Sequence, residues 1–193
     1  MSLFIPNLFA KNFAEPAKAQ ALGASATEIE ELAGECLRQM ELDRGGDLTA
    51  AVSRLGGRVS TMRSFGGGGA KLEAIGNEFV IEIFDHTHPR RDRFEIAHGL
   101  GHWVMHYLIP NQRDQVGIAW LRVPQYEDSP ANSEANRFAF AFLMPADEIR
   151  EFAATVSDTD RLTHAISDEF NVTGQAAHLR LLGLGLVKAP TPA

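Results

Sequence analysis

Three histidines spaced four residues apart are the side chains of this sequence whose type and spacing could do chemistry. They are His98, His102 and His106, in the segment Arg93–His106, where apolar residues recur at helical spacing. Four residues advance an α-helix by about 400°, so His98 and His102 lie on one face, about 6 Å apart along the axis. Two imidazoles placed in this way can bind one metal ion. A pair of histidines that simply points into the protein gives the same pattern.

The residues around the pair favour the metal site. Apolar side chains wrap most of this helix and indicate that it is buried: Ile96, Ala97, Leu100, Trp103, Val104 and Tyr107. A buried helix does not hold three imidazoles cheaply unless they have partners. His106 lies about 12 Å along the axis from His98, too far to share one ion directly. We therefore expect His106 to support the site or to face a substrate, and a hydrogen-bonded core histidine is an equal alternative.

Two motifs, in this order along the chain, resemble the signatures of one family. The segment Arg93-Phe94-x-x-Ala97-His98-x-Leu100-Gly101-His102, followed by His106, is similar to the metallopeptidase helix of the ImmA/IrrE family. The segment Glu134-Ala135-Asn136-Arg137-Phe138-Ala139-Phe140-Ala141-Phe142-Leu143-Met144-Pro145 resembles that family's second signature, E-A-N-x-F-A-x-x-L-L-M-P. The resemblance covers residues 25 to 188, most of the chain.

The resemblance implies a zincin-like fold with one zinc ion per chain. In the family, two histidines and a glutamate of the second helix bind zinc, and these carry over to His98, His102 and Glu134. Glu127 and Asp128 are the alternative carboxylate ligands. The general base of the family is the glutamate of H-E-x-x-H, and it is lost here because Gly99 stands in its place.

The glycine at position 99 has no advantage for the helix itself. Glycine inside a helix costs about 1 kcal/mol relative to alanine, which leaves three explanations: a natural pseudo-enzyme, an inactivating change, or a position where a side chain would block what binds there. Glu95 lies one turn earlier, but its side chain tilts away towards the N-terminus. We expect Gly99→Glu to raise hydrolysis by roughly 10²-fold or more. We also expect folding not to suffer, because glutamate is the better helix former.

Composition sets the broad class of the protein. Of the 193 residues, 45% are hydrophobic and 22% are charged, as in ordinary globular domains. The net charge of −7 gives no global attraction to nucleic acid. The single cysteine, Cys36, excludes an internal disulfide and suits a reducing cytoplasm. No apolar run is long enough to span a membrane and the N-terminus lacks the features of a signal peptide, so we expect a cytoplasmic protein.

The remaining pattern predicts an α+β fold that is mostly helical. Alternating segments at Arg58–Met62, Leu72–Ala74 and Phe79–Phe84 predict a small mixed sheet of about three strands. We expect the His98–His102 helix to pack on this sheet and to face the Glu134 helix. The expected helix caps are Thr27 with Glu30 as a capping box, Asp47, Asp92, and Ser129 followed by Pro130.

Three segments outside these elements have expected roles. Residues 1–24 are rich in apolar side chains and are expected to dock onto the body or a partner. Residues 85–93 form either a solvated polar loop or a basic rim beside the cleft, with His86, His88, Arg90, Arg91 and Arg93. The long connection Leu108–Asn132 is a candidate cleft wall or lid.

The C-terminal residues predict a helix-turn-helix-like unit around Phe170-Asn171-Val172-Thr173. Its second helix offers only His178 and Arg180 as readers of DNA, so we expect a helical cap and no direct DNA binding. The predicted organisation is therefore an N-terminal segment, 1–24, a metallopeptidase-like core, 25–157, and a C-terminal cap and tail, 158–193.

Two classes of function remain open. The resemblance implies a regulatory zinc endopeptidase that cleaves or binds a partner protein such as a transcriptional repressor, with hydrolysis impaired by the loss at Gly99. The alternative is an inactive metal-binding interaction module that acts as an antitoxin, a sensor or an anti-repressor does. Metal content supports both classes, so only turnover of a partner separates them.

Overall fold

The computed structural model describes residues 15–63, 70–85, 87–113, 117–125, 128–158 and 161–188. Its four-stranded mixed sheet has the order β1-β3-β2-β4. Strand β1 (Gly57–Met62) runs parallel to β3 (Glu78–Phe84), while β2 (Ala70–Ile75) is antiparallel to both β3 and β4 (Trp120–Pro124). In β3 buried residues alternate with more exposed ones, as expected for a strand with one face on the core. The α+β class and the mixed sheet confirm the prediction from the sequence.

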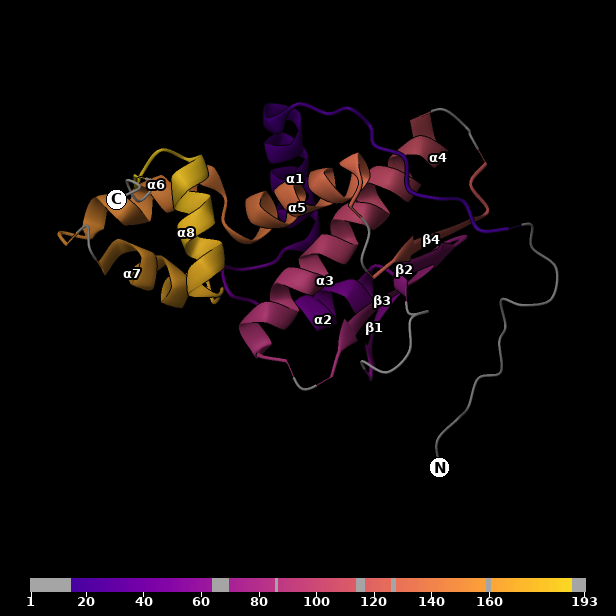
Figure 1. Cartoon of the computed structure of the whole chain (residues 1–193), viewed down its shortest axis with the longest axis horizontal. Helices are drawn as coiled ribbons and strands as arrows, with labels where there is room; N and C mark the ends of the chain where they lie inside the picture. The colour runs from indigo at the N-terminus through magenta and orange to yellow at the C-terminus, as the bar shows by residue number, and fades with distance from the viewer. Residues whose placement is uncertain are drawn as a thin grey trace.

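The helices gather on one face of the sheet and at one end of the molecule (Figure 1). Helix α3 (Pro89–Trp103) crosses the sheet, and α5 (Pro130–Leu143) packs between α3 and α1 (Ala26–Met40). The other helices are α2 (Leu48–Arg54), the π-helical turn η1 (Val104–Leu108), α4 (Ile109–Arg113), α6 (Ala146–Thr155), α7 (Leu162–Glu169) and α8 (Gly174–Gly183). Among the described residues, no helix is both long enough and apolar enough to span a bilayer.

The connection between the two motif helices is more structured than expected. It contains α4 and a fourth strand, β4, which pairs with β2 through contacts such as Ala74 with Leu121. The prediction of about three strands therefore missed one, because Pro124 and the surrounding polar residues conceal a strand of only five residues. Gln125 and Asp128, at the end of this connection, line a pocket beside His98, so this part of the segment forms a cleft wall.

Two predicted helix caps are wrong and two are confirmed. Helix α1 begins two residues earlier than expected, with Ser25 as its N-cap and Glu28 completing the capping box. Helix α3 is capped by the His88 side chain, whereas Asp92 accepts a hydrogen bond from Thr87. Asp47 and Ser129 cap α2 and α5 as predicted. In both errors, two polar residues competed for one helix start and the local pattern did not separate them.

The described part of the N-terminal segment, residues 15–24, lies along the edge of the sheet. Ala17 forms a parallel bridge with Leu121, in which the Ala17 amide donates to the Trp120 carbonyl at 2.8 Å. Further along, the amides of Leu22 and Ala24 each donate to the Glu134 carboxylate at 2.9 Å. These contacts join the segment to both β4 and α5. Residues 1–14, with most of the apolar side chains that suggested docking, are outside the described residues.

Helix α8 is fixed to the body by a buried arginine. Arg180 donates from two guanidinium nitrogens to the Glu30 carboxylate of α1 and from Nε to the Met144 carbonyl at the end of α5. Its side chain is 9% exposed, so it is not available to contact a DNA base. This removes one of the two candidate DNA-reading residues of α8 and fits a helix that closes the core.

We expect Arg180→Ala to lower the free energy of unfolding by about 2 kcal/mol, because it leaves the Met144 carbonyl without its donor and the partly buried Glu30 without its partner. Urea denaturation checks this value. Arg38→Ala is the matched control, since it removes an exposed arginine from an ion pair with Glu35 and should leave stability essentially unchanged. Equal effects in the two variants would contradict this account of how α8 is held.

Candidate functional site

The three histidines lie on the part of α3 and η1 that is enclosed by the sheet and α5. His98 is 7% exposed, and His102 and His106 are each 1% exposed. The ring centroids of His98 and His102 are 4.9 Å apart, and those of His102 and His106 are 5.0 Å apart. The helical spacing therefore stacks the imidazoles in a row, as predicted for His98 and His102.

A chain of hydrogen bonds runs from Glu134 on α5 through two of these histidines. Glu134 Oε2 lies 3.0 Å from His106 Nε2, and His106 Nδ1 lies 3.0 Å from His102 Nδ1. His106 belongs to the π-helical turn η1, a local widening that is frequent at functional sites. The structure thus brings His106 into contact with both motif helices, which agrees with a supporting role.

The charges along this row of hydrogen bonds determine which atoms carry the protons. Burial raises the pKa of Glu134, but hydrogen bonds from His106, Leu22 and Ala24 outweigh it and leave this pKa below its usual value. Burial lowers the pKa of His106, so at neutral pH an ionised Glu134 faces a neutral imidazole. An ionised carboxylate can only accept hydrogen bonds, so His106 donates to it from Nε2. The Nδ1 atom of His106 then has a lone pair, and it accepts a hydrogen bond from the protonated Nδ1 of His102. His102 Nε2 is then left with a lone pair.

Two buried imidazole nitrogens have no hydrogen-bond partner. They are His98 Nε2 and His102 Nε2. Asn132 on α5 interacts with both rings in the direction that raises their pKa values, but burial dominates. It lowers the pKa of His98 to about 3 and the pKa of His102 well below its usual value. Leaving polar atoms buried and unpaired costs free energy, and a metal ion bound by neutral imidazoles removes that cost.

The predicted third ligand, Glu134, occupies a different position from the two free nitrogens. Its two oxygens already accept from Leu22, Ala24 and His106. Within the described ranges, no three His, Cys, Asp or Glu side chains converge closely enough to hold a metal ion. The two histidines fit a metal ion as a pair, and the neutral Asn132 side chain of α5 lies beside both of them. Of the alternative carboxylates, Asp128 lines the pocket beside His98, and Glu127 is outside the described residues.

Gly99 faces the sheet, and this explains why it lacks a side chain. A Cβ atom at this position would lie 2.6 Å from Cγ2 of Ile81 and 2.9 Å from its Cγ1, and Ile81 is fully buried in β3. Real Cβ contacts are not this short, so Ile81 or the helix would have to move. This contact argues against the expectation that Gly99→Glu leaves folding intact. This close packing is an explanation separate from the three given above, because the side chain would clash with the sheet and not with something bound at the site.

A pocket of about 440 Å³ opens beside His98. Its polar lining includes the amides of Asn132, Asn136 and Gln125 together with a contact between Lys71 and Glu95. The Lys71 side chain is 4% exposed, and burial, followed by the charge of Arg91, lowers its pKa to about 8. Such a lining offers hydrogen-bond donors and acceptors to a polar ligand.

The basic residues at the start of α3 make different contacts. Arg91 lines the pocket, whereas Arg90 donates to Ser167 and Asp168 of α7, and Arg93 donates to the Gly46 carbonyl. His88 caps α3, and His86 is outside the described residues. The predicted basic rim is therefore reduced to Arg91 beside the cleft.

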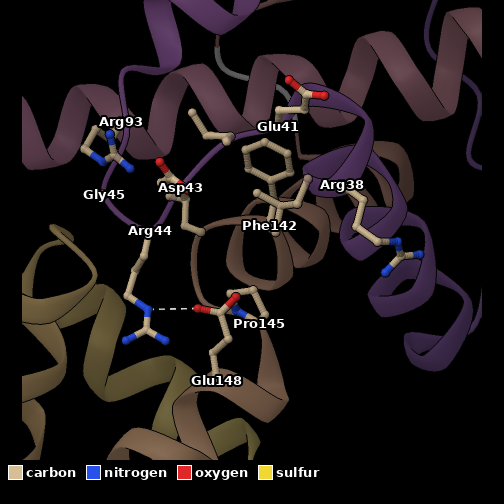
Figure 2. Close-up of a pocket in the computed structure, with 12 residues that line it drawn as sticks. Arg38, Glu41, Asp43, Arg44, Gly45, Arg93, Phe142, Pro145 and Glu148 are labelled. Atoms are coloured by element: carbon tan, nitrogen blue, oxygen red, sulfur yellow. Dashed lines mark hydrogen bonds and ion pairs between the residues drawn. The ribbon is translucent and has the colours of Figure 1, made fainter.

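A second pocket, of about 330 Å³, lies where the connection between α1 and α2 meets the end of α5 (Figure 2). Arg44 reaches across it and donates to Glu148 of α6 at 2.8 Å and to Glu169 of α7 at 2.7 Å. Its guanidinium also lies 4.8 Å above the Phe170 ring. These contacts hold the C-terminal helices against the core, which accounts for the polar lining of this pocket.

The arrangement of sheet, histidine helix and facing helix defines a zincin-like, metallopeptidase-like domain. Residues 59–182, more than half of the chain, match the family described as the IrrE N-terminal-like domain (Peptidase_M78), and the chain belongs to this family. The match confirms the resemblance seen in the two motifs.

Comparison with solved structures gives the same fold. The chain is similar to a Mycobacterium tuberculosis transcriptional regulator with a TM-score of 0.52 and 19% sequence identity, over 80% of this chain and 46% of that one. At this identity the similarity shows the fold alone, and the chain spans less than half the length of that protein. No curated protein matches the chain.

Sequence reasoning missed two residues of the site. Asn132 precedes the second motif by two positions, and its spacing of four from Asn136 on one helix face was the available signal. Lys71 lies in β2, far from both motifs in the sequence, and its burial depends on the pairing of strands. No local pattern could have identified it.

We expect Gly99→Ala to destabilise the protein although alanine is the better helix former, because the new methyl group meets Ile81. Gly34→Ala in α1 is the matched control, since its Cβ has only an ordinary contact of 3.6 Å with Arg38 and should raise stability by up to about 1 kcal/mol. Thermal and urea denaturation of both variants measure the difference. Stabilisation of similar size at both positions would contradict the packing assigned to Gly99.

We expect the metal-free protein to lose stability on acidification. The folded state keeps His98 neutral down to about pH 3, whereas the unfolded chain protonates it near pH 6.5. Between these values the unfolded state binds more protons, so stability falls as pH falls, by about 2 kcal/mol from pH 7.5 to pH 5 for His98 alone. Urea denaturation at several pH values, repeated with His98→Gln, should show a shallower dependence in the variant. Identical slopes would mean that folding does not lower the pKa of His98.

Proposed function

We propose that this chain is a peptidase-like regulatory module that binds a protein partner, such as a transcriptional repressor, and hydrolyses it slowly or not at all. The observation that carries the proposal is the contact between Gly99 and Ile81. The sheet occupies the space into which a side chain at position 99 would extend. A general base contributes roughly 10²–10⁴-fold to such a reaction, and this chain has none on that turn.

The metal-binding part of the proposal depends on His98 and His102. Their free Nε2 atoms would hold one divalent ion, with zinc favoured by imidazole ligands. When bound, such an ion polarises a peptide carbonyl. The Asn136 and Gln125 side chains supply polar groups that can orient an extended peptide beside it. These features support recognition of a polypeptide more directly than its cleavage.

A metallo-endopeptidase in which Glu95 acts as the base is the second candidate. It is favoured by the position of Glu95, which lines the same pocket as His98 one turn before Gly99. It is opposed by Lys71, whose ammonium group contacts that carboxylate and holds it. Glu95→Gln separates the two candidates, because it should abolish any residual hydrolysis only if Glu95 is the base.

The test uses a repressor encoded near this protein's own gene, incubated with zinc-supplemented protein. We expect a stoichiometric complex by calorimetry and an unchanged partner mass by mass spectrometry over several hours. His102→Ala, which removes one metal donor, should not create cleavage. Metal-dependent cleavage by the unaltered protein, lost in His102→Ala, would overturn the proposal and favour the endopeptidase.

A further inference from the structure

We infer that Asn132, and not Glu134, is the third protein group at the metal position, and that Glu134 is a positioning residue that acts on His102 through His106. The inference deepens the proposed function, because it concerns the same site. It assigns a neutral donor set of two imidazoles and one amide oxygen. It also explains why the second motif keeps a glutamate that is not free to bind metal.

The geometry of α5 separates the two residues. Asn132 and Glu134 are two positions apart in one helix, which places their side chains about 200° apart around its axis. Asn132 lines the pocket of His98. Glu134 lines a different hollow, shared with Gly23, Ala24 and Arg137. One straight helix cannot direct both side chains at the same ion.

Three hydrogen bonds hold the Glu134 carboxylate in its orientation, away from the two free imidazole nitrogens. Oε1 accepts from the Ala24 amide at 2.9 Å, and Oε2 accepts from the Leu22 amide at 2.9 Å and from His106 at 3.0 Å. Turning this carboxylate towards His98 would leave two backbone amides and one buried imidazole without their acceptor. Each such loss leaves a buried polar group unpaired and is therefore unfavourable.

The same contacts let Glu134 orient His102. Glu134 accepts a hydrogen bond from His106 Nε2, so the other ring nitrogen of His106, Nδ1, is an acceptor. The 3.0 Å contact between the two Nδ1 atoms then requires the proton of His102 to lie on its Nδ1. His102 is held in the tautomer whose Nε2 carries a lone pair. Carboxylates that orient a ligating histidine through a hydrogen bond typically contribute 10–100-fold to metal affinity. Here one additional imidazole separates the carboxylate from the ligand.

The test measures metal binding and needs neither partner nor turnover, so it can fail while the proposed function stands. Zinc affinity is measured by competition with a chelator, and Co²⁺ is used as a spectroscopic probe, because its visible absorption bands depend on the atoms that bind it. Asn132→Asp converts the amide into a carboxylate at the start of α5, where a negative charge suits the helix. Asn136→Asp is the matched control, since it adds the same charge to the same pocket one turn away.

We expect Asn132→Asp to tighten zinc binding at least tenfold and to shift the Co²⁺ bands, while Asn136→Asp changes affinity by less than threefold. Glu134→Gln should weaken zinc binding by 10–100-fold and leave the positions of the Co²⁺ bands unchanged. If Glu134→Gln does not fold, the pair of variants at positions 132 and 136 still decides. A shift of the bands in Glu134→Gln, equal effects of the two aspartates, or no metal binding even by Asn132→Asp would overturn the assignment.

Discussion

The structure depends on the close approach of helix α3 to the layers on both of its sides. On one side a Cβ at Gly99 would lie 2.6 Å from Ile81 of the sheet, and on the other a Cβ at Gly101 would lie 3.1 Å from Phe138 and 3.2 Å from Ala135 of α5. Two glycines in one helix cost about 2 kcal/mol of helix propensity. The close packing on both faces offsets this cost, and it brings the histidines of α3 within reach of α5.

The same packing buries the histidines, so their hydrogen bonds determine how each imidazole ring is oriented. At such buried positions, an unpaired imidazole nitrogen costs free energy and a hydrogen-bonded one has a fixed orientation. Glu134 pairs with His106, and His106 pairs with His102, so the ionised carboxylate organises the row from one end. At the other end, the free nitrogens of His98 and His102 remain beside Asn132. The chain thus keeps the histidines of its family but presents them with an amide as the facing group and no base at position 99.

The sequence predicted those parts of the structure that depend on one element at a time. The period of the histidines placed His98 and His102 on one helix face, and alternation located three strands of the sheet. The predicted role of Glu134 came from the motif and from its shared face with Phe138, yet that face is turned towards His106 and the N-terminal segment. The neighbour that each side of a helix contacts depends on packing between distant segments, and sequence periodicity alone does not predict that neighbour.

The same limit applies at Gly99, because helix propensity favours glutamate there while the tertiary contact with Ile81 disfavours any side chain.

The central claim, that Glu134 fixes His102 through His106, concerns the position of two protons. Nitrogen-15 NMR of the imidazole rings in the metal-free protein at neutral pH observes them directly. The account predicts His106 protonated at Nε2 and His102 protonated at Nδ1. A proton on His102 Nε2, or on both nitrogens of His106, would contradict it.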